Sequence, residues 1–280
     1  MTNSQWSRFQ QVRQNYKTYI DELSTVLPNL SDVLSQLVAA RSGPAYPVET
    51  PVVYNHALDD IGPKDQIKII LVADNPGRRE QSAAERRYLI GPSGKLADGF
   101  FRQHPELGIE FRKHVLILNK CPIHTPRTGE LRDLTHLGGP SIEQAIKESQ
   151  YAMARFIHQF HEIFAGEAEL WIIGYSELGR GKLFEPFTNA LLNTYSVKNT
   201  GAGPATEISP AAWALPAGTA PESRTSTNEN PHLKNSIYLY RHFSMNQFSA
   251  DFARQRFEGE STQETLHRIG SQYRARIFGW

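Results

Sequence analysis

The sequence predicts an α/β protein with a three-layer α/β/α architecture, in which helices cover both faces of a four-stranded, mostly parallel central sheet. Four short apolar runs are typical of strands buried on both faces, and they occupy residues 67–73, 114–118, 170–173 and 236–240. Helical patterns separate the first three runs, as the crossover connections of a parallel sheet require. The length suits one core, so we expect a single domain over residues 1–280.

The first 43 residues are expected to form a layer of two helices. Apolar residues recur at three- and four-residue steps from Trp6 to Leu23, which describes one face of an amphipathic helix. A second helix is expected at 31–41, with Ser31 as its N-cap and a Ser-Gly-Pro stop after its end. We interpret this N-terminal helical layer, residues 1–43, as a lid or a packing layer.

Further helices are expected between and after the strands. Residues 94–103 and 141–164 carry helical patterns in the two intervals between the first three apolar runs. The segment 199–235 is dense in Gly, Pro, Ser, Thr and Asn and lacks periodicity, so we interpret it as a long, mobile loop insertion before the fourth strand. Two closing helices are expected around 246–257 and 262–278.

Composition limits the classes of function. The chain has 30 Lys and Arg against 29 Asp and Glu, a net charge of +1, so a nucleic-acid site would have to be local. No apolar run approaches the roughly 18 residues of a membrane span, and the polar amino terminus does not resemble a secretory signal peptide. We therefore expect a cytoplasmic protein, monomeric and without a membrane partner.

Cofactor motifs are also missing from the sequence. Cys121 is the single cysteine, which excludes a disulfide framework, a Cys-based structural zinc site and the four thiolates of an iron–sulfur cluster. The Walker spacing, a Gly-x-Gly-x-x-Gly motif after a strand and a His-Glu-x-x-His pattern do not occur. We expect no metal and no organic cofactor.

Polar residues follow the predicted strands, where an open parallel sheet binds its ligands. An Asp-Asn-Pro-Gly sequence is by itself a common turn, an Asn after a strand is an ordinary loop residue, and a lone His is most often structural. Here Asn75, Asn119 and His242 come after three different strands, a combination that turn chemistry does not require. The sequence therefore predicts a site at this edge of the sheet.

The motifs around this site resemble those of the uracil-DNA glycosylase superfamily. Residues 74–77 are similar to its first motif in the Asn-Pro-Gly form of the mismatch-specific and single-strand-selective branches, and residues 115–119 to the strand that carries the uracil-reading Asn. His242-Phe-Ser resembles its His-Pro-Ser motif, with Phe in place of Pro. Residues 91–96 resemble a stretch of the bacterial iron–sulfur branch, whose cluster this chain cannot ligate. The matches keep the family's order over residues 67–248.

The resemblance implies a base-excision repair glycosylase that hydrolyses the N-glycosidic bond of uracil, or of a related damaged base, in DNA and leaves an abasic site. It implies that His242 stabilises the developing oxyanion on uracil O2 and that Asn75 positions the water, with Asp74 as a second candidate. Asn119 would accept from uracil N3–H and donate to O4, which distinguishes uracil from cytosine. An amide at position 75 cannot accept a proton, so weaker catalysis is expected.

The resemblance also assigns the walls of the base pocket and the DNA contacts. Leu89 replaces the family's stacking ring, and Tyr88 is the candidate to supply a ring instead. Gly77 stands where the uracil-specific branch has Tyr, so rejection of thymine is not ensured. DNA would be held by basic residues, a helix start and the segment after His242, with Met245 as the wedge in the base stack: Arg78, Arg79, Ser93, Lys95, Ser244, Met245 and Asn246.

Two other interpretations stay open. Residues 174–178 imitate the Gly-x-Ser-x-Gly nucleophile elbow of a serine esterase with Ser176 as nucleophile, although Leu178 replaces the second Gly. The other is a catalytically weak or inactive nucleic-acid-binding protein of the same fold, which the amide of Asn75 and the Phe after His242 favour. Ester hydrolysis and uracil release separate these alternatives from a glycosylase.

Overall fold

The central sheet is parallel throughout. The computed structural model describes residues 1–41, 43–196 and 231–280, and within them four strands lie in the order β2-β1-β3-β4. Each neighbouring pair of strands is parallel. The strands are β1 Ile69–Ala73, β2 Val115–Asn119, β3 Glu169–Ile173 and β4 Ile237–Tyr240, within one or two residues of their predicted positions. The prediction of an α/β fold with a four-stranded sheet is confirmed.

The strand order places a ligand crevice beside β1. From β1 the chain crosses to β2 on one side of it and then to β3 on the other, so the order reverses at the carboxyl end of β1. In the register, Ala73 of β1 is paired with Asn119 of β2 and Ile173 of β3 with Tyr240 of β4. The segments that follow all four strands therefore leave the sheet at the same edge.

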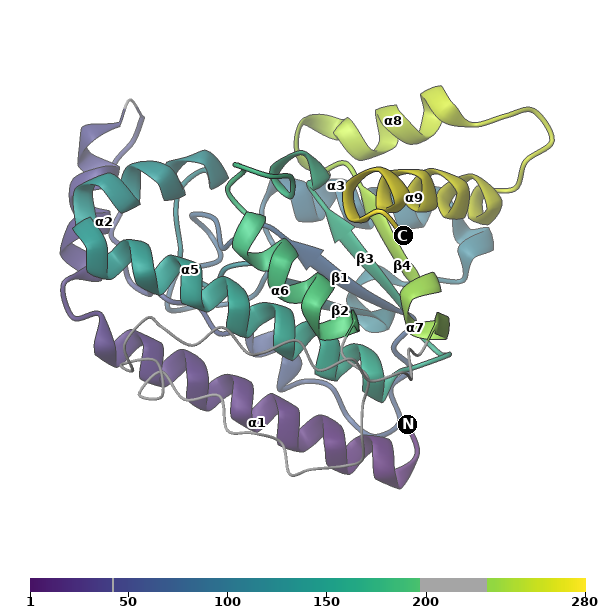
Figure 1. Cartoon of the computed structure of the whole chain (residues 1–280), viewed down its shortest axis with the longest axis horizontal. Coiled ribbons are helices and arrows are strands. Elements are labelled where there is room, and N and C mark those ends of the chain that lie inside the picture. The colour runs from purple at the N-terminus through teal and green to yellow at the C-terminus, as the bar shows by residue number, and fades with distance from the viewer. Residues whose placement is uncertain (42, 197–230) are drawn as a thin grey trace.

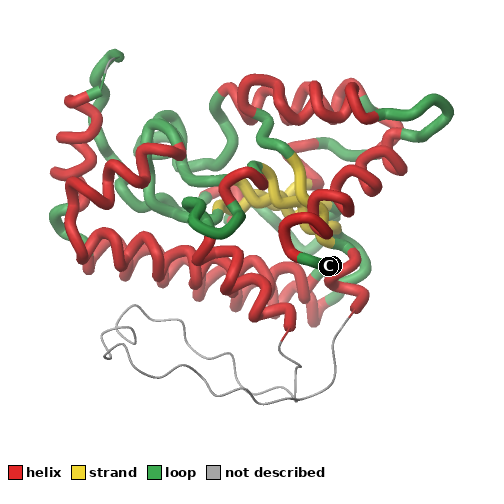
Figure 2. Tube along the Cα trace, turned by 45° about the horizontal axis from the view of Figure 1, so that its top comes forward, coloured by secondary structure: helices red, strands yellow, loops and turns green. Residues whose placement is uncertain are grey.

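Helices cover both faces of the sheet, which lies between them in Figures 1 and 2. Alternate residues of β1 divide between the two cores: Ile70 and Val72 belong to one cluster, whereas Ile69 and Leu71 belong to the other. The first cluster includes residues of α1 Asn3–Val26, α2 Leu30–Ala40, α5 Leu131–Ile163 and α6 Glu185–Ser196. The second includes residues of α3 Pro92–Gln103, α8 Gln247–Gln255 and α9 Thr262–Phe278.

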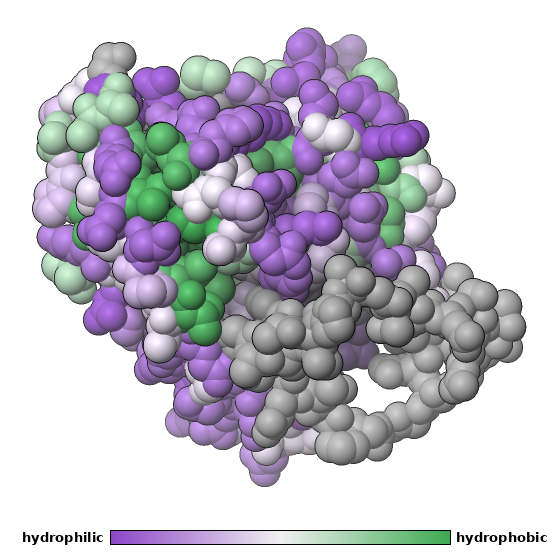
Figure 3. All heavy atoms as spheres, turned by 60° about the vertical axis from the view of Figure 1, so that its left-hand side comes forward, coloured by the Kyte–Doolittle hydropathy of each residue, from purple (hydrophilic) through white to green (hydrophobic). Residues whose placement is uncertain are grey.

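The N-terminal helical layer is a packing layer and not a lid. Buried residues of α1 and α2 pack in the same core as α5, and the pocket at the sheet edge is lined by none of residues 1–41. Ser31 is not the N-cap of α2, because the helix begins at Leu30, whose side chain is buried, and Asn29 holds the cap position. Figure 3 shows that the surface on the α2 side is mainly hydrophilic, with a band of apolar side chains.

Two helices differ from the sequence prediction. Helix α5 begins ten residues earlier than expected, because the chain is helical on both sides of a break at Gly139 (φ 70°, ψ −168°) and Pro140 opens the second half. Helix α6 was not predicted. Of the expected insertion 199–235, residues 231–235 form the short helix α7 Pro231–Asn235, while the mobility expected for the remainder concerns residues outside those described. No helix in the described part of the chain has the length and apolarity to cross a bilayer.

Candidate active site

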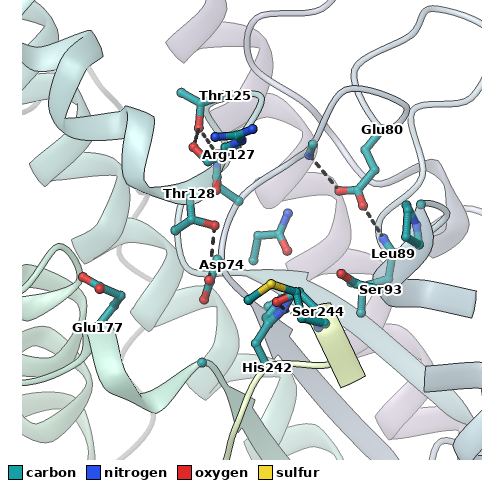
Figure 4. A pocket seen from close by; sticks show the side chains of 18 of the residues that line it. Asp74, Glu80, Leu89, Ser93, Thr125, Arg127, Thr128, Glu177, His242 and Ser244 are labelled. Carbon is teal, nitrogen blue, oxygen red and sulfur yellow. Dashed lines mark hydrogen bonds between the residues drawn. The ribbon is translucent and has the colours of Figure 1, made fainter. Parts of the chain in front are cut away.

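A cavity of about 690 Å³ opens at the carboxyl edge of the sheet (Figure 4). Residues after all four strands line it, together with the segment Leu89–Ser93 before and at the start of α3. This volume falls within the range of small-molecule sites. Most of the residues that the sequence singled out meet here: Asp74, Asn75, Gly77, Arg78, Arg79, Leu89, Ser93, Asn119, His242, Ser244 and Met245.

Three of the predicted site residues do not line the cavity. Tyr88 is 1% exposed, and its hydroxyl donates to the Val53 carbonyl at 2.5 Å and lies 3.1 Å from the Tyr16 hydroxyl. Its ring belongs to the core, so the prediction that it stacks on a base is wrong. Lys95 lies exposed on the first turn of α3, and Asn246 is part of the turn before α8, both outside the lining.

His242 presents an N–H group to the cavity. Its Nδ1 accepts the backbone N–H of Ser244 at 3.0 Å and lies 2.8 Å from the Ser244 hydroxyl, so the proton of the neutral ring is on Nε2. Burial lowers the pKa of His242, an effect that Asp74 opposes and Lys120 reinforces. The ring is therefore neutral near pH 7, and its Nε2–H has no hydrogen-bond partner among the described residues.

The residue after His242 is held by packing. Phe243 has φ −69°, a value that a Pro at this position would also take, and its fully buried ring stacks on Phe248 at 4.2 Å between centroids. The next turn is strained, because Met245 and Asn246 both adopt positive φ angles of 50° and 56°. This conformation leaves the Met245 side chain 83% exposed at the cavity.

Asn75 offers an oxygen to the cavity. Its Nδ2 donates to the Ile123 carbonyl at 3.1 Å and to the Thr125 hydroxyl at 2.8 Å. Both amide hydrogens are thereby used on the protein side, whereas Oδ1 has no partner within the described part of the chain. The residue can accept a hydrogen bond from a molecule in the cavity.

Asp74 is engaged in a buried ion pair. Its Oδ1 lies 2.5 Å from Lys120 Nζ and its Oδ2 accepts from the Thr128 hydroxyl at 3.2 Å, as Figure 4 shows for Thr128. Lys120 is fully buried and also donates to the Ile173 carbonyl at 2.5 Å. Burial lowers the pKa of Lys120, and Asp74 opposes that shift. With both oxygens occupied, Asp74 is a weaker candidate for activating water than its position in the sequence indicated.

Asn119 has a buried amide nitrogen without a partner among the described residues. The residue is 1% exposed and lines the cavity, and its Nδ2 is buried with no hydrogen-bond acceptor in the structure as described. A buried donor left unsatisfied costs about 1–3 kcal/mol. Such a group at the edge of a cavity is available to a ligand that brings an acceptor.

One wall of the cavity is held by groups that the sequence did not reveal. Leu89 has a positive φ of 51°, its N–H donates to Glu80 Oε1 at 3.0 Å, and its carbonyl accepts from the Arg112 guanidinium. Glu80 Oε2 also accepts the N–H of Gly77 at 3.2 Å, so one carboxyl group joins two walls of the site. Burial raises the pKa of Glu80 to about 7. Neither Glu80 nor Arg112 belongs to a sequence motif from which its role at the site could have been predicted.

The rim of the cavity carries cations. Arg78 lies over the Tyr46 ring at 4.7 Å, and Arg79 is 3.7 Å from the exposed carboxylate of Glu85. Ser93 lies in the first turn of α3, and no side chain caps the first N–H groups of this helix among the described residues. These groups suit an anion at the mouth of the site.

Neither a serine nucleophile nor a metal site forms in the described residues. Ser176 is exposed and lines the cavity, but His242 Nδ1 is occupied by Ser244 and no hydrogen bond joins Ser176 to His242 in the described chain. This weighs against the esterase interpretation. No group of three or more His, Cys, Asp or Glu side chains could hold a metal ion in the part of the chain described, and the absence of a cofactor stays a prediction.

Comparison with known proteins does not assign the chain to a family. No known family model matches it, and no curated protein matches it.

Proposed function

We propose that the protein is a DNA glycosylase that hydrolyses the N-glycosidic bond of uracil, or of a related damaged base, and leaves an abasic site. The observation that carries the proposal is the buried Nδ2 of Asn119, which has no partner among the described residues and lies in the same cavity as Asn75 and His242. With its oxygen toward N3–H and its nitrogen toward O4, the amide complements uracil, whereas cytosine would require the reverse orientation.

Bond cleavage requires that charge be stabilised on the departing base. The base leaves as an anion, and the Nε2–H of neutral His242 is available to donate to its O2 as negative charge develops. The Oδ1 of Asn75 is available to orient a water molecule toward C1′. Because an amide does not take up the proton, the hydrolysis is expected to be slower than with a carboxylate.

The rim of the cavity suits DNA with its target base flipped out of the stack. Arg78, Arg79 and the start of α3 near Ser93 provide positive charge and N–H groups for phosphates. The exposed side chain of Met245 is placed to fill the gap that the flipped base leaves. We propose that the protein is a monomer, that its partner is DNA and that it is located in the cytoplasm. The free, buried thiol of Cys121 is compatible with a reducing cytoplasm.

One observation favours a second candidate, a nucleic-acid-binding protein of the same fold with little or no catalysis. Both oxygens of Asp74 are bonded, one to Lys120 and one to Thr128. The group left to activate water is therefore the amide of Asn75, which cannot take up a proton. Such a protein would keep the base pocket and the cationic rim without breaking the bond.

Abasic-site formation distinguishes the two. End-labelled single-stranded and duplex oligonucleotides carrying one uracil, opposite A or G, are incubated with the protein and a metal chelator and then cleaved with alkali. We expect wild type to yield cleavage, and His242→Ala and Asn119→Asp to lose it by about 100-fold or more while remaining folded. Salt-sensitive binding without cleavage by wild type would favour the binding protein, and wild-type cleavage rates in both variants would overturn the site.

A further inference from the structure

The segment Ile123–Thr125 lies against the Asn75–Pro76 turn and bonds to it at several points. The Nδ2 of Asn75 donates to the Ile123 carbonyl at 3.1 Å and to the Thr125 hydroxyl at 2.8 Å. The Pro76 carbonyl accepts from the N–H of Thr125 at 3.3 Å and from Nδ1 of His124 at 2.9 Å. This segment therefore holds both the backbone and the side chain at the position that faces the cavity.

The direction of each bond determines which way the Asn75 amide points. The Thr125 hydroxyl donates its hydrogen to the Arg127 carbonyl at 2.8 Å, so toward Asn75 it presents a lone pair (Figure 4 shows the bond to Arg127). The Ile123 carbonyl is also an acceptor. Two acceptors on this side attract the amide nitrogen and repel the amide oxygen, so Oδ1 is the atom left for the cavity.

His124 holds the backbone independently of the amide. The carbonyl of Pro76 only accepts, so His124 Nδ1 carries the hydrogen, and His124 Nε2 accepts from the Tyr46 hydroxyl at 2.9 Å. The turn would thus keep its path if the Thr125 hydroxyl were removed. Loss of that hydroxyl should leave the amide nitrogen with the Ile123 carbonyl as its remaining acceptor, which loosens the orientation of the Asn75 side chain while leaving the fold of the turn.

We propose that Thr125 is a positioning residue that turns the acceptor oxygen of Asn75 toward the hydrolytic water, an inference that rests on the proposed glycosylase function. A water that attacks C1′ must present a lone pair to carbon, so its hydrogens need an acceptor on the protein. A reversed amide would offer N–H groups in that place and would compete for the same lone pair. The hydroxyl of Thr125 acts through Asn75 and does not itself touch the substrate.

Single-turnover uracil release tests the proposal. Thr125→Val keeps the shape of the side chain but removes the hydroxyl, whereas Thr125→Ser keeps the hydroxyl. We expect Thr125→Val to slow release by about tenfold or more, with the Kd for the uracil oligonucleotide changed less than about twofold, and Thr125→Ser to stay within about threefold of wild type. Thr188→Val, a buried threonine with two hydroxyl bonds away from the cavity, is the matched control for stability.

Two further backgrounds separate positioning from general damage. In Asn75→Ala there is no amide to orient, so adding Thr125→Val should cost no more than about twofold. In Asn75→Asp an acceptor oxygen faces the cavity in either orientation of the carboxylate, so Thr125→Val should slow release less than it does in wild type. If Thr125→Val lowers the Tm more than the Thr188→Val control, Thr125→Ala is measured in the same backgrounds.

The possible failures are distinguishable. If wild type releases uracil and Thr125→Val does so at the same rate, the positioning role is wrong while the proposed function stands. An equal loss from Thr125→Val in wild type and in Asn75→Ala would also overturn it, because the hydroxyl would then act without Asn75. If wild type releases no uracil from any oligonucleotide, the proposed function fails, and this inference fails with it.

Discussion

At the scale of single residues, the site depends on which polar atoms the protein leaves unbonded. The backbone N–H of Ser244 occupies Nδ1 of His242 and leaves Nε2–H for a ligand. The Ile123 carbonyl and the Thr125 hydroxyl occupy the nitrogen of Asn75 and leave its oxygen. Asn119 keeps a buried nitrogen that has no acceptor among the described residues. The cavity thus offers donors at His242 and Asn119 and an acceptor at Asn75, and the proposed reaction also uses the amide oxygen of Asn119 as the acceptor for uracil N3–H.

Glu80 makes stability depend on pH. Burial raises the pKa of its carboxyl group from 4.5 to about 7, so between these values the folded protein holds a proton that the unfolded chain has released. The free energy of unfolding therefore falls as the pH rises from 4.5 to about 7. We expect Glu80→Gln to reduce this decline, measured as Tm against pH. The exposed Glu258→Gln is the control, and identical pH profiles for Glu80→Gln and wild type would contradict this account.

The sequence predicted the residues of the site better than their partners. Asn75, Asn119 and His242 could be found because each lies at or just beyond the end of a strand, and parallel strands end at one edge. The role of Lys120 could not be predicted, because a lysine after a strand is usually exposed. Its burial against Asp74 is visible only in the folded structure. Tyr88 was misassigned for a related reason: sequence adjacency to Leu89 does not say which side chain turns inward.

At the scale of elements, helix α3 forms one side of the cavity by packing closely on the Leu89 wall. A Cβ on Gly94 would overlap the carbonyl oxygen of Leu89, whereas a Cβ on Gly99 of the same helix would meet open space. We expect Gly94→Ala to lower the free energy of unfolding by about 1–3 kcal/mol and Gly99→Ala to raise it by about 0.5–1 kcal/mol. Urea denaturation measures both free energies of unfolding. Equal effects from the two substitutions would show that Gly94 is not in close contact with the Leu89 carbonyl.

The strands were predictable because each is a continuous apolar run between polar turns, and burial on both faces requires that pattern. The first part of α5 was not, because it lies before Gly139 and Pro140, a pair that signals a helix boundary, and the helical pattern was identified only beyond them. The start of α2 was missed by one residue because burial of Leu30 outweighs the capping preference of Ser31.

At the scale of the whole molecule, the charge is nearly balanced, so the proposed binding of DNA depends on local positive charge such as that of Arg78 and Arg79 at the cavity. With a net charge of +1, general attraction to DNA is small, and the salt dependence of binding reports only the few phosphates that contact the protein. We expect Arg78→Gln to reduce the slope of log K against log salt by about 1. Lys95→Gln, on the exposed side of α3, should leave the slope unchanged. Equal slopes for wild type and Arg78→Gln would remove Arg78 from the interface.

The central claim is that the cavity at the carboxyl edge of the sheet releases a base from DNA. The most direct measurement is the appearance of free uracil, identified by mass, in a single-turnover reaction with a uracil-containing oligonucleotide and chelator present. We expect about one uracil per abasic site with the DNA strand unbroken before alkali, and at least about 100-fold slower release by His242→Ala. No free uracil from wild type on single-stranded or duplex DNA, or equal release by His242→Ala, would contradict the claim.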